Sequence, residues 1–167
     1  WLLDHLDLAL AEAELQFDIS AHVGIERIDI RDGVHLLKRI LTEPEKRRAG
    51  RRLRIQCEGA EYRGRGRLVN WNMTVTAVSA AVQKVSPINF WNPDSTVEVD
   101  GNTVHWENVT TGGFHAVDVW LDDTTGGFLQ LRNNDSEFQV DMAELGTEDM
   151  VYDLGGLGKA IRITRLP

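Results

Sequence analysis

Residues 58–75 read EGAEYRGRGRLVNWNMTV, and this stretch joins a ladder of arginines to the most regular alternation in the chain. From Val69 onward, apolar and polar residues alternate, which gives an extended backbone one apolar and one polar face. The apolar face carries Val69, Trp71, Met73 and Val75. The stretch therefore predicts a strand with one face in a hydrophobic core, and it predicts that Trp71 is a core residue rather than a ligand-stacking one.

The arginine ladder, Arg63, Arg65 and Arg67, alternates with glycines. An extended backbone would place all three side chains on the same face as Trp71. Three unpaired arginines cannot enter an apolar core. We therefore expect either a bulge at one of the intervening glycines, or a strand that continues beyond its sheet. In both cases the arginines face water, as at a solvated sheet edge, or contact an anion or a neighbouring domain.

The same two-residue period recurs on both sides of this stretch. Turn residues at Asp32-Gly33 predict a hairpin between strands at 25–30 and 34–40, and Asp100-Gly101-Asn102 predicts a second hairpin. Further strands are expected over 15–23, 53–57, 82–90, 97–99, 103–109 and 117–121, with more inward-facing rows between 129 and 163.

Ten to twelve short strands separated by turns, with almost no helix, are typical of an antiparallel β-sandwich, either immunoglobulin-like or jelly-roll-like. We expect a single domain over residues 15–167, because a chain of 167 residues is large enough to bury one hydrophobic core. Residues 1–14 form a short helix or a connecting segment in this interpretation, since their leucines fit both helical and strand spacing. The pattern does not predict the order of the strands.

Composition limits the classes of partner. The net charge is −8, and nine of the 18 basic residues lie between positions 46 and 67. Because the acidic remainder repels polyanions, we expect no nucleic-acid partner, whereas a small anion or the acidic face of another domain is compatible with the local basic patch. No apolar run is long enough for a transmembrane helix, so we expect no membrane partner. The single cysteine, Cys57, allows no internal disulfide and agrees with a soluble, cytoplasmic protein.

No pattern singles out catalytic chemistry or a metal centre. The five histidines lie at none of the spacings that zinc or iron ligands require. Asp122-Asp123 suits a solvated turn better than a calcium loop, and the Gly-rich run at 155–159 lacks the serine or threonine of a phosphate-binding loop. No serine lies in a Gly-x-Ser-x-Gly motif, and Cys57 is expected on a buried row where a thiol is inert. We therefore expect no catalytic residue, metal ligand or cofactor in this chain.

Several blocks of the sequence form a distinctive combination. They are IERIDIRDG (25–33), EGAEYRGRGR (58–67), PINFWNP (87–93), VHWENVTTG (104–112), VDVWLDD (117–123), DLGGLG (153–158) and RLP (165–167). Together, over about residues 15–167, they resemble the C-terminal region of a family of largely uncharacterised bacterial proteins. The N-terminal region of that family is similar to PHP-type metal-dependent phosphoesterases. The resemblance implies that the metal-binding motifs lie upstream, so no catalytic residue is carried over to this chain.

These observations lead to one main hypothesis and two alternatives. The main hypothesis is a non-catalytic accessory domain that packs on, stabilises or gates a preceding hydrolase-like domain of the same polypeptide, with Arg63, Arg65 and Arg67 as the contact surface. The first alternative is a free-standing module that binds a carbohydrate or a small anion, for which Trp91 and Trp106 would form an exposed aromatic platform. The second is an enzyme in its own right, which the missing site pattern disfavours.

Overall fold

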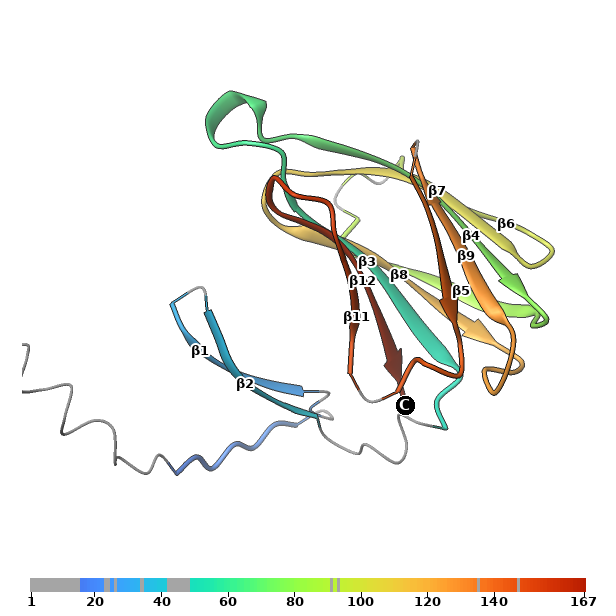
Figure 1. Ribbon diagram of the computed structural model, residues 1–167, viewed down its shortest axis with the longest axis horizontal. Helices are drawn as coiled ribbons and strands as arrows, with labels where there is room; N and C mark the ends of the chain where they lie inside the picture. The colour runs from blue at the N-terminus through green and yellow to red at the C-terminus, as the bar shows by residue number, and fades with distance from the viewer. Residues whose placement is uncertain are drawn as a thin grey trace, which may run out of the picture.

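The computed structural model describes residues 16–22, 25, 27–33, 35–41, 49–90, 92, 94–134, 136–146 and 148–167. These residues form twelve strands, arranged as two five-stranded antiparallel sheets and a separate two-stranded hairpin (Figure 1). The two large sheets pack face to face, which confirms the predicted antiparallel β-sandwich. No helix in the described part of the chain is long and apolar enough to cross a membrane.

The first large sheet, called sheet 1 here, has the order β11-β12-β3-β8-β5, and the second, sheet 2, has the order β10-β9-β4-β7-β6. Sheet 1 contains β3 (Arg52–Ala60), β5 (Val82–Ile88), β8 (Phe114–Leu121), β11 (Met150–Asp153) and β12 (Leu157–Leu166). Sheet 2 contains β4 (Val69–Val78), β6 (Val97–Asp100), β7 (Thr103–Thr110), β9 (Phe128–Asn133) and β10 (Ser136–Asp141). The chain passes repeatedly between the two sheets, so neighbours in a sheet are often distant in sequence.

The hydrophobic core lies between the two sheets and follows the predicted alternation. In β4 buried residues alternate with exposed or half-buried ones along all ten positions, and Trp71 is 1% exposed. Trp106 is also 1% exposed, so an aromatic platform built on that residue is absent, whereas Trp91 lies outside the described residues. Cys57 is fully buried as predicted, and burial raises the pKa of its thiol well above the usual value.

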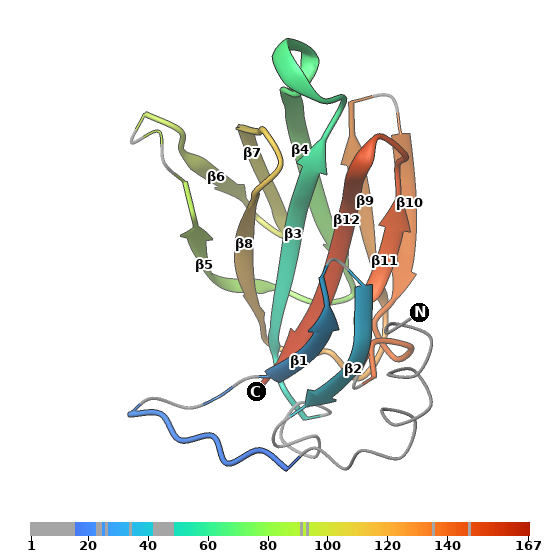
Figure 2. The same cartoon turned by 90° about the vertical axis from the view of Figure 1, so that its left-hand side faces the viewer.

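The two predicted hairpins are present. Strands β1 (Arg27–Asp32) and β2 (His35–Leu41) pair across the turn at Gly33, and β6 and β7 pair across the turn at Gly101. The β1–β2 hairpin is not part of either large sheet. It lies over the outer face of sheet 1, in front of β12 and β11 (Figure 2).

The prediction of a strand over residues 15–23 is wrong for residues 16–22, the part that the structure describes. Residues 16–22 are exposed and form no strand, with Phe17 and Ile19 57% and 49% exposed. Alternation creates an apolar face but supplies no hydrogen-bond partner, and no described strand pairs with this segment. Residues 1–14, expected to form a helix or connecting segment, lie outside the described residues.

The prediction for the arginine ladder is also wrong in its local structure. Strand β3 ends at Ala60, a 3₁₀ turn (η1) spans Gly64–Gly66, and β4 begins at Val69 in the opposite sheet. Gly64 has a φ of +75°, a left-handed conformation that glycine tolerates and that breaks the extended backbone. The ladder is therefore neither a bulged strand nor a strand running past its sheet, because it is the crossover between the sheets.

Candidate functional site

The crossover between β3 and β4, residues 61–68, is called the arginine loop here, and it protrudes from one end of the sandwich (Figure 1). Arg63, Arg65 and Arg67 are all exposed, as predicted, and no side-chain ion pair or hydrogen bond joins any of them to another described residue. Tyr62 and Leu68 are exposed beside them, with 66% of Tyr62 accessible. The loop thus presents three unpaired guanidinium groups together with the apolar surface of Tyr62 and Leu68.

Arginines of the β1–β2 hairpin and of β12 behave differently, as the network beneath the hairpin shows. The Asp149 carboxylate is 2% exposed and accepts hydrogen bonds from Arg39 Nη1 at 2.6 Å, Arg162 Nη1 at 3.2 Å and Arg27 Nη1 at 3.3 Å. Thr164 Oγ1 donates a further bond at 2.9 Å. One buried carboxylate therefore ties both strands of the hairpin to β12.

A second buried carboxylate pairs with an arginine on the outer face of sheet 1. Asp118 on β8 accepts two bonds from Arg54 on β3, at 2.7 and 3.0 Å, a geometry that suits the planar guanidinium. A cavity of about 300 Å³ between the hairpin and this face is lined by Arg27, Arg31 and Arg54, among others. Each of these arginines lies within 3.7 Å of an aspartate oxygen, so the cavity is a poor site for an added anion.

A buried polar cluster lies at the end of the core below the arginine loop. Trp106 Nε1 donates to His115 Nε2 at 3.2 Å, and the rings of Trp71 and Phe90 contact His115 edge to face. His115 is 1% exposed, and burial lowers the pKa of its imidazole to about 4. A neutral imidazole that accepts the indole hydrogen bond at Nε2 carries its own proton on Nδ1. His115 thus serves the packing of the two sheets.

Asp122-Asp123 and the start of the Gly-rich run at 155–159, which were considered as metal and phosphate sites, both lie in turns. Asp123 accepts hydrogen bonds from the backbone and hydroxyl of Thr125, at 2.9 and 2.8 Å, and these bonds hold the pKa of its carboxyl below the usual value. Gly155 donates its backbone N–H to Asp153 at 2.7 Å in the turn between β11 and β12. Among the described residues, no three His, Cys, Asp or Glu side chains come together in a way that could hold a metal ion.

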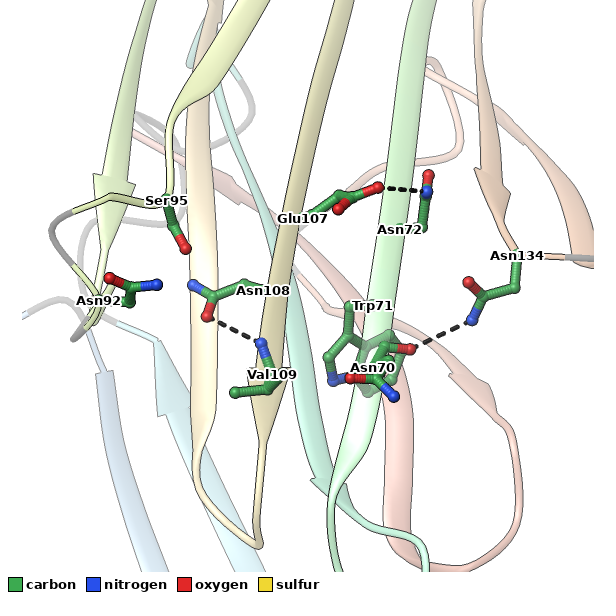
Figure 3. Close-up of a pocket in the computed structure, with 9 residues that line it drawn as sticks. All are labelled: Asn70, Trp71, Asn72, Asn92, Ser95, Glu107, Asn108, Val109 and Asn134. Carbon is green, nitrogen blue, oxygen red and sulfur yellow. Dashed lines mark hydrogen bonds between the residues drawn. The ribbon is translucent and has the colours of Figure 1, made fainter.

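Sequence reasoning missed a depression of about 760 Å³ at the loop end of sheet 2 (Figure 3). It is lined mainly by amides, and the full set is Asn70, Trp71, Asn72, Asn92, Ser95, Glu107, Asn108, Val109 and Asn134. The alternation placed Asn70 and Asn72 on the polar face of β4 but could not bring residues of β7 and the segment after β5 beside them. One signal was available, because Asn108 occupies an inward position in the row of Val104 and Trp106.

No protein-family model, curated protein or solved structure matches this chain. The resemblance to the C-terminal region of PHP-associated bacterial proteins therefore stays a prediction.

The network around Asp149 predicts that the hairpin depends on one carboxylate. Substituting Asp149→Asn should lower the free energy of unfolding by about 3 kcal/mol, because it leaves three arginines around a neutral amide in a nearly dry site. Hydrogen exchange should quicken first in β1 and β2. The matched control is Asp153→Asn, an exposed turn residue whose amide oxygen can still accept from Gly155. Equal exchange of the hairpin amides in both variants would contradict this role of Asp149.

Burial of His115 predicts an acid-dependent loss of stability. Its folded-state pKa of about 4 lies below the ordinary value of 6.5, so the unfolded state binds the proton first as the pH falls. The free energy of unfolding should therefore decrease between about pH 6.5 and pH 4, by roughly 3 kcal/mol from this group. Urea titrations of the wild type and of His115→Gln, which keeps a neutral acceptor, measure the difference. Parallel pH profiles for the two proteins would show that His115 is not the cause.

Proposed function

We propose that this chain is a non-catalytic accessory β-sandwich domain that docks through its arginine loop onto a metal-dependent hydrolase-like domain preceding it in the same polypeptide. One observation carries the proposal. Arg63, Arg65 and Arg67 are exposed without partners at the protruding end of the domain, while arginines of the hairpin and sheet 1 engage carboxylates.

The chemistry of the loop suits a protein contact. Arginine and tyrosine are the residue types that most often carry binding energy at interfaces, because they combine planar apolar surface with hydrogen-bond donors. Tyr62 and Leu68 supply the apolar surface, and the three guanidinium groups supply donors for carboxylates. The rest of the chain is acidic, which directs a complementary acidic partner to this end rather than to the sheets.

The side chains best suited to catalysis support a non-catalytic role. The Cys57 thiol lies in the core with a raised pKa, His115 bonds to an indole, and Asp118 holds Arg54. Each of these groups is engaged in packing or in an ion pair and is inaccessible to a substrate.

Hydrogen exchange of the arginine loop tests the docking. In the polypeptide that includes the preceding region, amides of residues 61–68 should exchange at least about tenfold more slowly than in the isolated chain, because docking covers them. The triple variant Arg63→Ser, Arg65→Ser, Arg67→Ser should abolish that protection. The control is Arg132→Ser, which removes an exposed charge from β9. Equal exchange in the long and short proteins would contradict the docking surface.

The non-catalytic part of the proposal is tested with the same isolated chain. Incubated with phosphoester substrates and divalent metal ions, it should show no turnover above background. Turnover that disappears on a point substitution within residues 15–167 would overturn this assignment even if the loop proved to be a contact surface.

A further inference from the structure

The β1–β2 hairpin turns its charged face toward the sandwich and an apolar face away from it. Asp29 and Arg39 are directly opposite each other in the hairpin, and Arg39 also bonds to the buried Asp149. Successive residues of a strand point to opposite faces, so the neighbouring pair, Ile28 and Ile40, points away from sheet 1. Ile40 is 40% exposed, and neither isoleucine belongs to the hydrophobic core. A two-stranded sheet of this kind is marginally stable without a further strand or covering layer.

Residues 16–22 carry the alternation of a strand but pair with none of the described strands. Their apolar row includes Phe17 and Ile19, which are 57% and 49% exposed. Two perpendicular views show this segment leading away from the start of β1 rather than along its edge (Figure 1, Figure 2). The segment therefore offers what the hairpin lacks, a third strand with an apolar row.

The outer edge of β1 is the hairpin edge better suited to a third strand. Ile30 is paired with Lys38 and Arg31 with Leu36, so Leu37 of β2 is an extra residue that forms a bulge. A bulge distorts the strand that contains it, whereas β1 is regular and contains no proline. No described strand pairs with the outer edge of β1. Such an edge is a template for another strand.

The edges of the two large sheets are less open to strand addition. β5 contains Pro87 and an irregularity between Val82 and Lys84, and β6 and β11 have only four residues each. On β10 the carbonyl of Gln139 already accepts a hydrogen bond from the Tyr152 hydroxyl. Proline, bulges and short length are means by which sheets prevent unwanted pairing. A further strand is therefore expected at β1.

We propose that this chain forms a dimer in which residues 16–22 of each copy add as a third strand to the outer edge of β1 in the other copy. An antiparallel register with Ile19 opposite Ile30 and Ala21 opposite Ile28 extends the apolar face of the hairpin across all three strands. Reciprocal exchange of the same segment gives a closed twofold assembly. This surface is separate from the arginine loop and does not depend on the docking proposed for it.

The charged face of the hairpin supports the same register. That register sets Asp18 opposite Arg31 and Ser20 opposite Asp29, so the carboxylate of the added strand meets a guanidinium. A register shifted by two residues would set Asp18 opposite Asp29 instead, and like charges directly opposite each other are unfavourable.

A second copy, rather than the same chain, is the occupant that the structure supports. Only residues 23–26 separate the segment from β1, yet the chain does not fold the segment back onto that edge. A short connection favours exchange between copies, because the segment reaches a neighbouring molecule without a tight reversal of the chain.

Sedimentation equilibrium of the isolated chain from about 1 µM to about 1 mM tests the dimer, which should replace the monomer as the concentration rises. In the double variant Ile19→Pro, Ser20→Pro the segment loses two successive backbone N–H groups, one of which points to β1 in any antiparallel pairing. Its dimer dissociation constant should rise about tenfold or more. The control Val99→Ser removes a similarly exposed apolar side chain from β6 and should leave the constant unchanged.

Disulfide trapping identifies the paired strands and the molecules that carry them. Directly opposite residues of an antiparallel pair have Cα atoms about 4.5–5.5 Å apart, which suits a disulfide. Chains with Ile19→Cys, ¹⁵N-labelled, and chains with Ile30→Cys should form a mixed disulfide on mild oxidation, identified by mass. Ile19→Cys mixed with Val99→Cys should not. The native Cys57 is buried and does not compete.

The proposal is overturned if the wild type stays monomeric at every concentration, or if the proline variant dimerises as tightly as the wild type. It is also overturned if no mixed disulfide forms between residues 19 and 30 at concentrations at which the wild type is dimeric.

Discussion

Two indole N–H groups are buried in this core, and each must find an acceptor that is not water. Trp71 Nε1 donates to Thr110 Oγ1 at 2.9 Å, and that hydroxyl donates in turn to the carbonyl of Gly59 at 2.7 Å. Trp106 donates to His115 across the two sheets. Both sets of hydrogen bonds run from sheet 2 to sheet 1. The two buried indole N–H groups therefore fix how the sheets pack at this end.

The surface proposed to contact a partner domain is attached to that buried end. The arginine loop begins two residues after Gly59 and leads into the strand that carries Trp71. The backbone at Gly59 is itself locked, because a Cβ there would lie 2.2 Å from the carbonyl oxygen of Gly158. The depression beside Asn70 and Asn72 lies at the same end of sheet 2, on its outer face. A shift of Thr110 would therefore displace the backbone from which the arginine loop starts.

Much of this fold follows from local sequence, and the failures have physical causes. Alternation in 69–75 and turn residues at Gly33 and Gly101 predict strands and hairpins, because both signals act within a few residues. The same reasoning fails for the arginine ladder, because β3 already ends at Ala60 and Gly64 has a positive φ, so the backbone is not extended where the alternation assumes a strand. Residues 16–22 alternate but have no described partner strand. Strand order and the depression beside Asn70 arise from pairings between distant residues, which an alternation pattern does not contain.

The two hydrogen bonds that join Trp71 to Thr110 and Thr110 to Gly59 hold the loop end of the sandwich together. Thr110→Val keeps the shape of the side chain and removes both hydrogen bonds. We expect the free energy of unfolding to fall by about 2 kcal/mol, with faster exchange of the Trp71 indole N–H. The control Thr76→Val, on the solvent side of β4, should change stability by less than about 0.5 kcal/mol. Unchanged stability and indole exchange in Thr110→Val would contradict the claim.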